Sequence, residues 1–114
     1  MLVYRLESNS GEGPYNDWNP LGKKLCKSHA VRRPTLVESG LFLPGREQFC
    51  ACESLKELRN WFRGWWKQLL VSGYRAVVYD VSEEFVNIGY QQLLFVKNKA
   101  KFVRCVSDAP IKTF

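Results

Sequence analysis

The segment from Ser54 to about Val71 constrains the fold most, because it carries the pattern of a capped amphipathic helix. Ser54-Leu55-Lys56-Glu57 matches a capping box, and Gly73 suits the left-handed conformation at which many helices end. On a helical wheel the apolar side chains fall within about half the circumference. They are Leu55, Leu58, Trp61, Phe62, Trp65, Trp66, Leu69 and Leu70. The pattern predicts one helix with a wide buried face.

After Gly73 the hydrophobic period changes to two, which is typical of strands. The predicted strands are Tyr74–Val81, Phe85–Val96 and Phe102–Val106, with Leu2–Leu6 as a fourth. The three strands that follow Gly73 are joined by short connections, so they are expected to form an antiparallel meander. The sequence therefore predicts an α+β fold in which one helix packs on a sheet of about four strands.

Chain length and the positions of proline and glycine indicate the domain organisation. A chain of 114 residues that is 46% hydrophobic is large enough for one core, so residues 1–114 are expected to form a single domain. Residues 8–49 show no sustained period and are interrupted repeatedly by proline and glycine. We expect a long irregular loop there, and thus the order strand, long loop, helix and three strands.

The expected compartment is the cytoplasm. Arg5 and Glu7 lie where a signal peptide needs its apolar part, and no apolar run approaches the ~18 residues that a membrane span requires. The four cysteines are accordingly expected to be reduced thiols rather than a disulfide framework. No membrane partner is predicted.

Positive charge is the clearest surface feature, with a net charge of +6. Lys56, Arg59, Arg63 and Lys67 form a stripe along the predicted helix, and Trp66 borders it. Such a stripe can follow phosphates or an acidic protein surface, although the alternative is a solvated helix face. Two more clusters could join it: Lys23, Lys24, Lys27, Arg32 and Arg33 in the long loop, and Lys97, Lys99, Lys101 and Arg104 near the last hairpin. The predicted binding surface consists of the helix stripe with Trp66 and, from the first cluster, Lys23, Lys24, Arg32 and Arg33.

Metal binding and catalysis receive less support. Cys26, His29, Cys50 and Cys52 form two close pairs that could hold zinc, but buried thiols are the preferred interpretation. The chain has one histidine and no hydrolase, nucleotide-loop or zinc-protease motif, which leaves Cys26 and His29 as the one nucleophile and base pair to consider. No metal, cofactor or catalytic residue is predicted, and a non-enzymatic protein is favoured.

Several motifs together resemble a family of small, largely uncharacterised bacteriophage and prophage proteins. These are YRLE at residues 4–7, G-x-G-P-Y at 11–15, His29, S-L-K-E-L-x-x-W-F at 54–62 and G-Y-Q-Q-x-x-F at 89–95. The resemblance covers nearly the whole chain. It implies an accessory protein that binds and disables a host or defence protein or nucleoprotein, and it makes Cys50 and Cys52 packing residues. A basic nucleic-acid-binding module and a homodimer stay open.

A second, more distant similarity concerns the order of three residues. Arg5, Ser54 and Gln91 are similar in order to the residues of arginine–serine–glutamate ADP-ribosyltransferases. That similarity implies a transferase acting with NAD, or a degenerate relative of one. The sequence departs from the pattern because glutamine cannot act as a carboxylate, and Ser54 is better explained as a helix cap. This stays an alternative.

Overall fold

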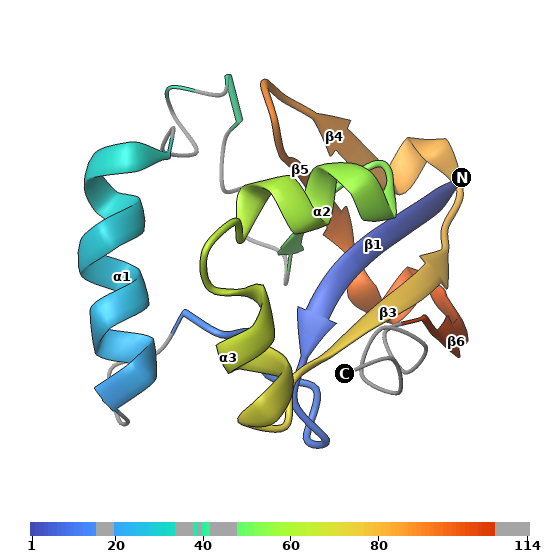
Figure 1. Ribbon diagram of the computed structural model, residues 1–114. Coiled ribbons are helices and arrows are strands. Elements are labelled where there is room, and N and C mark those ends of the chain that lie inside the picture. The colour runs from blue at the N-terminus through green and yellow to red at the C-terminus, as the bar shows by residue number, and fades with distance from the viewer. Residues whose placement is uncertain (16–19, 34–37, 39, 42–47, 107–114) are drawn as a thin grey trace.

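The computed structural model describes residues 1–15, 20–33, 38, 40–41 and 48–106, without the side chains of residues 30–32 (Figure 1). The α+β class is confirmed. The helices are α1 (Pro20–Arg32), α2 (Leu55–Trp61) and α3 (Trp66–Val71), with short 3-10 turns η1 (Glu83–Phe85) and η2 (Lys97–Lys99). The strands are β1 (Leu2–Glu7), β2 (Gln48–Ala51), β3 (Arg75–Asp80), β4 (Val86–Ile88), β5 (Leu93–Val96) and β6 (Lys101–Cys105). No helix in these ranges has both the length and the apolar character to cross a bilayer.

The strands form two antiparallel sheets of three, where the sequence predicted one sheet of about four. Their orders are β1-β3-β6 and β2-β5-β4. The predicted strand Phe85–Val96 is a hairpin instead, because the chain turns where the amide of Gly89 donates to the carbonyl of Gln92. The backbones of Tyr4 and Cys52 join the two sheets through two hydrogen bonds of 2.8 Å. β1 and β2 therefore meet edge to edge.

The predicted irregular loop at 8–49 contains α1 and the first two residues of β2. Pro20 begins α1 at a position where its missing N–H costs nothing. Leu21, Leu25 and His29, four residues apart, turn one face of this helix inward, and Leu25 and His29 are buried. The sequence prediction failed because this face is narrow and contains a histidine. β2 has four residues and receives its pairing from the distant strand β5.

The predicted continuous helix is two helices, although both of its ends are confirmed. Ser54 Oγ accepts from the amide of Glu57 at 3.1 Å, while the Glu57 carboxylate accepts from the amide of Glu53 at 3.3 Å. At the far end the amides of Gly73 and Tyr74 bond the carbonyls of Leu70 and Leu69, a Schellman arrangement. Between them Gly64 adopts a φ of +86°, which breaks the helix.

The core has two parts, one on each face of the first sheet. The first part joins that sheet to the helices and contains Leu6, Leu25, Cys52, Leu58, Phe62, Leu69, Tyr74 and Ala76. The second part joins the two sheets and contains Val3, Ala51, Val77, Tyr79, Val81, Leu93 and Phe95. Because alternate side chains of a strand point to opposite faces, Leu6 serves the first part while Val3, Arg5 and Glu7 face the second sheet.

Replacing Gly64 with alanine tests the helix break. At a φ of +86° a Cβ meets no atom within 4 Å, so the cost comes from the left-handed backbone alone. We expect Gly64→Ala to lower the free energy of unfolding by about 1–2 kcal/mol and Gly64→Asn to lower it by less, measured by urea denaturation. A stabilised alanine variant would show that α2 and α3 form one continuous helix.

Candidate functional site

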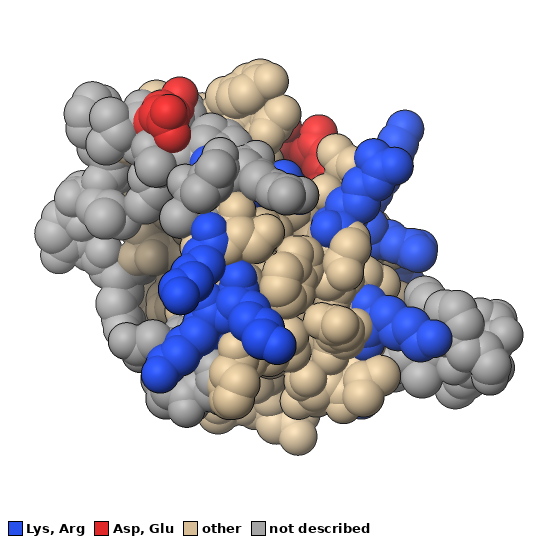
Figure 2. Space-filling model, turned by 60° about the vertical axis from the view of Figure 1, so that its left-hand side comes forward, with Lys and Arg blue, Asp and Glu red and all other residues tan. Residues whose placement is uncertain are grey.

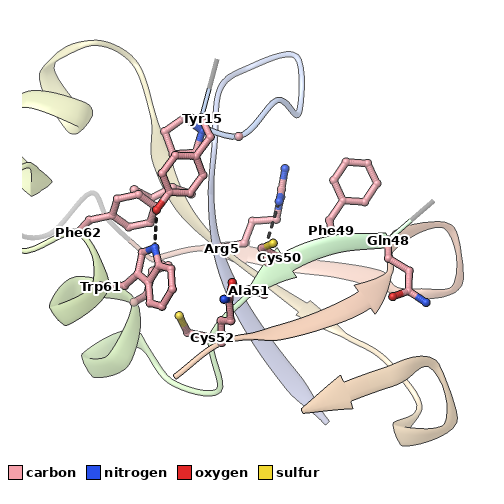
Figure 3. Close-up of a pocket in the computed structure, with 14 residues that line it drawn as sticks. Arg5, Tyr15, Gln48, Phe49, Cys50, Ala51, Cys52, Trp61 and Phe62 are labelled. Carbon is pink, nitrogen blue, oxygen red and sulfur yellow. Dashed lines mark hydrogen bonds between the residues drawn. The ribbon is translucent and has the colours of Figure 1, made fainter. Parts of the chain in front are cut away.

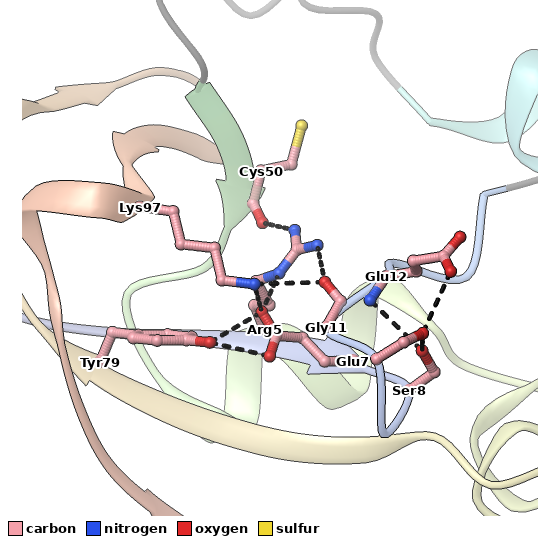
Figure 4. Close-up of polar contacts among 9 residues, drawn as sticks. Arg5, Glu7, Ser8, Gly11, Glu12, Cys50, Tyr79 and Lys97 are labelled. Carbon is pink, nitrogen blue, oxygen red and sulfur yellow. Dashed lines mark hydrogen bonds and ion pairs between the residues drawn. The ribbon is translucent and has the colours of Figure 1, made fainter.

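A buried carboxylate organises the polar interior between the sheets (Figure 4). Glu7 Oε2 pairs with Arg5 Nε at 2.7 Å and with Lys97 Nζ at 2.8 Å. The hydroxyl of Tyr79 donates to the same carboxylate at 2.8 Å. Burial is the larger cause that raises the pKa of Tyr79, and the hydrogen bond to Glu7 raises it further. We call Arg5, Glu7, Tyr79 and Lys97 the Glu7 cluster. Its four members come from β1, β3 and η2, so it links both sheets.

The guanidinium of Arg5 extends the Glu7 cluster to β2 and to the loop after β1. Its Nη1 donates to the carbonyl of Cys50 at 3.1 Å, and its Nη2 lies 3.5 Å from the carbonyl of Gly11. The guanidinium carbon stands 4.8 Å from the centre of the Phe49 ring. A Cβ on Gly13 would lie 3.3 Å from Nη2, so the glycine leaves room for this close approach.

Arg5 also faces a cleft of about 290 Å³ where β1 and β2 meet (Figure 3). Three aromatic side chains, Tyr15, Trp61 and Phe62, lie on one side of it, whereas Arg5 and Phe49 lie on the other. We call it the Arg5 cleft. Its full lining is Arg5, Leu6, Gly13, Pro14, Tyr15, Gln48, Phe49, Cys50, Ala51, Cys52, Leu58, Trp61, Phe62 and Gln92.

A chain of hydrogen bonds holds the aromatic side of the cleft against α1. The indole nitrogen of Trp61 donates to the hydroxyl oxygen of Tyr15, and that hydroxyl lies 2.6 Å from Nδ1 of His29. Because the tyrosine oxygen accepts from the indole, its hydrogen is available to Nδ1, which places the imidazole proton on Nε2. Within the described residues, the buried Nε2 has no hydrogen-bond partner. Burial and the nearby charge of Arg33 lower the pKa of His29 to about 4, so the ring is neutral.

The cysteines form neither of the sites considered from the sequence. All four are free thiols, and no group of three or more His, Cys, Asp or Glu residues in the described ranges could hold a metal ion. Cys26, His29, Cys50 and Cys52 are thus not brought together as ligands. Burial raises the pKa of Cys50 and, with nearby carboxylates, raises that of Cys52 to about 12. Both thiols stay protonated, which makes them poor nucleophiles. His29 Nδ1 faces Tyr15, so Cys26 and His29 form no hydrogen-bonded catalytic pair.

The three residues of the transferase comparison occupy different surroundings. Arg5 lines the cleft, whereas Ser54 caps α2 and is absent from the lining. Gln91 lies in the β4–β5 turn with a φ of +65° and donates to the Tyr90 hydroxyl. Its neighbour Gln92, which is buried, lines the cleft instead. The cleft thus combines an arginine with a carboxamide, and the described part of its lining contains no acidic residue.

Lys and Arg side chains gather on the side of the molecule that carries α1 (Figure 2). This view brings the side of α1 forward, and it shows many Lys and Arg side chains with acidic ones only near the upper edge. The exposed cations of the helices and the turn between α2 and α3 are Lys23, Lys24, Lys27, Lys56, Arg59, Arg63 and Lys67. We call these residues the basic helical face. Trp66 belongs to it as a half-buried ring 5.6 Å from the Arg59 guanidinium.

The other predicted basic residues have different positions. Arg33 is turned inward, where its Nε donates to the carbonyl of Trp61 at 2.8 Å and ties the end of α1 to the end of α2. The side chain of Arg32 lies outside the described part of the structure. Lys97 belongs to the Glu7 cluster, and the remaining cations of that group lie on or near β6, across the molecule from α1 (Figure 1).

Sequence reasoning missed the residues that join these features. Glu7 belongs to the motif YRLE and Tyr15 to the motif G-x-G-P-Y, but the sequence assigned no function to either residue. An acid two residues after an arginine on one strand places both side chains on the same face, which is a signal for a buried pair. No comparable local signal marks Tyr79 or Trp61, because their partners come from distant parts of the chain.

A protein-family model described as the bacteriophage T4 Y00F protein matches residues 1–109 of the chain. This match confirms the resemblance to a small phage protein family. Comparisons with curated proteins and with solved structures gave no match.

The pKa of His29 predicts that acid destabilises the fold. This group titrates near 6.5 in an unfolded chain and near 4 in the folded one. Between these values only the unfolded state binds the proton, so the free energy of unfolding falls as the pH drops from about 6.5 to about 4, by up to about 3 kcal/mol. Denaturation at pH 6.5 and pH 5 should show a smaller decrease for His29→Gln than for the wild type. Equal decreases would contradict the assignment.

Removing the Tyr79 hydroxyl tests the Glu7 cluster. Tyr79→Phe should lower the free energy of unfolding by about 1.5–3 kcal/mol, because a charged acceptor loses a buried donor. Tyr4→Phe is a matched control, since no hydrogen bond of its hydroxyl is present in the described structure, and it should change stability by less than about 0.5 kcal/mol. Thermal or urea denaturation measures both. Equal effects of the two substitutions would show that the cluster does not stabilise the fold.

Proposed function

The chain belongs to the bacteriophage T4 Y00F protein family, and we propose that it acts without catalysis by binding an acidic surface of a host or defence protein or nucleoprotein. The observation that carries the proposal is the basic helical face: the described parts of the helices and the turn between α2 and α3 carry seven exposed cations, and Lys and Arg side chains gather on the side of the molecule that carries α1 (Figure 2). Clustered charge of one sign attracts an oppositely charged partner and raises its association rate.

The arrangement of α1 and α2 supports one contact surface rather than scattered charges. Arg33 binds the Trp61 carbonyl, and the ring of His29 stands 6.3 Å from that of Trp61, edge to face. These contacts dock the end of α1 against the end of α2. The indole of Trp66 packs near Arg59, so the surface combines positive charge with aromatic area, a combination that is common where interfaces gain most of their energy.

Two other features favour stoichiometric binding over catalysis. Burial keeps the thiols of Cys50 and Cys52 protonated, and the imidazole of His29 is enclosed and bonded to Tyr15. The groups best able to act as a nucleophile or a base are therefore unsuited to those roles at neutral pH. A protein that works by occupying a surface requires neither.

A pull-down from bacterial lysate tests the proposal. We expect the wild type to retain a partner and Arg59→Glu/Arg63→Glu to lose at least about 90% of it, with binding that weakens as salt increases. The matched control is Lys101→Glu/Arg104→Glu, which changes the charge equally on β6 and should retain the partner. Circular dichroism checks that both variants are folded.

The outcomes separate the classes of partner. A protein that survives nuclease treatment supports the proposal, and a protein released by nuclease identifies a nucleoprotein. Recovery of nucleic acid alone would favour the basic nucleic-acid-binding module instead. Equal retention by the two charge-reversed variants would overturn the assignment of the basic helical face.

A further inference from the structure

We propose that the Arg5 cleft is a binding site for a small ligand that carries an aromatic ring and an anionic group, of the size of a mononucleotide. The site is separate from the basic helical face and does not depend on the function proposed for it. Its volume of about 290 Å³ lies at the lower end of the usual range for small-molecule sites, which limits the ligand to about one ring system with its substituents.

The anionic group follows from the charge balance around Arg5. Arg5 and Lys97 share one carboxylate, that of Glu7, so the Glu7 cluster has an excess positive charge. Among the described residues that line the cleft, Arg5 is the only charged one, and the two thiols there stay neutral. A buried cluster with unbalanced positive charge is costly, and an anion bound beside Arg5 reduces that cost.

The hydrogen-bonding capacity of Arg5 points the same way. Its side chain is buried, and a guanidinium carries five N–H groups. Three acceptors engage it, namely the Glu7 carboxylate and the carbonyls of Cys50 and Gly11. Within the described residues, two N–H groups are left without an acceptor. A guanidinium with two free donors beside a cleft suits a phosphate or carboxylate, which accepts several hydrogen bonds at once.

The aromatic part of the ligand follows from the other side of the cleft. The rings of Tyr15, Trp61 and Phe62 face the cleft there, and Phe49 lies beside Arg5 (Figure 3). Planar heterocycles gain stacking energy on such rings. The hydrogen bonds from Trp61 to Tyr15 and from Tyr15 to His29 fix the ring orientations before any ligand binds. Gln92 adds a buried carboxamide to the lining, a group that can recognise the polar edge of a ring.

The test uses purified full-length protein with nucleoside 5′-monophosphates and the matching uncharged nucleosides. Because Trp61 lines the cleft, tryptophan fluorescence reports on binding, and isothermal titration calorimetry measures Kd. We expect at least one monophosphate to bind about tenfold or more tightly than its nucleoside. An aromatic carboxylate serves as a second probe and shows whether the anion must be a phosphate.

Variants at Cys50 locate the site without disturbing the Glu7 cluster, since Arg5 bonds the backbone carbonyl of this residue. Cys50→Phe fills the cleft and should weaken binding about tenfold or more, whereas Cys50→Ser preserves the space and should bind within about twofold of the wild type. Arg59→Glu/Arg63→Glu should bind as well as the wild type. Absence of binding by every probe, equal binding of nucleosides, unchanged affinity in folded Cys50→Phe, or loss of binding in the Arg59 and Arg63 variant would each overturn the proposal.

Discussion

One buried carboxylate, that of Glu7, is the polar group through which the two sheets are joined. Glu7 ends β1 and receives Arg5 from the same strand, Tyr79 from β3 and Lys97 from the turn after β5. A buried carboxylate is stable only when its oxygens are paired, and these three partners can reach it only when both sheets are in place. The charge of Glu7 is therefore neutralised only when the two sheets pack against each other. The Glu7 cluster holds two cations and one carboxylate, so Glu7 does not use all the donors of Arg5. Two N–H groups of Arg5, which faces the cleft, have no acceptor within the described residues.

A second constraint is the left-handed Gly64, which divides the tryptophan-rich segment into α2 and α3. An unbroken helix would carry its apolar and basic side chains in fixed stripes along one axis. The break lets Trp66 begin a new helix and brings its ring to Arg59, while Leu69 and Leu70 remain in the core. One local backbone conformation thus places an aromatic ring within the cationic surface.

Features decided by neighbouring residues could be predicted from the sequence, and features decided by distant partners could not. The capping of α2 by Ser54, the stop at Gly73 and strands β1, β3 and β6 follow from local propensities and hydrophobic period. α1 was missed because its buried face includes His29, and the group that bonds one of its ring nitrogens, the Tyr15 hydroxyl, comes from another segment. The basic residues were predicted as separate clusters, because whether the clusters adjoin depends on where α1 docks. The Arg5 cleft required contacts between segments that no local pattern connects.

The docking of α1 links the two surfaces that the structure presents. Its inward side provides His29 to the hydrogen bonds that orient Tyr15 and Trp61, which form one side of the cleft. Its outward side carries Lys23, Lys24 and Lys27. Arg33 fixes the end of the helix to the carbonyls at the end of α2. A shift of α1 would therefore change the aromatic side of the cleft and the spacing of cations on the basic helical face together. Occupancy of either surface has a physical route to the other, because both depend on the same few contacts between α1 and α2.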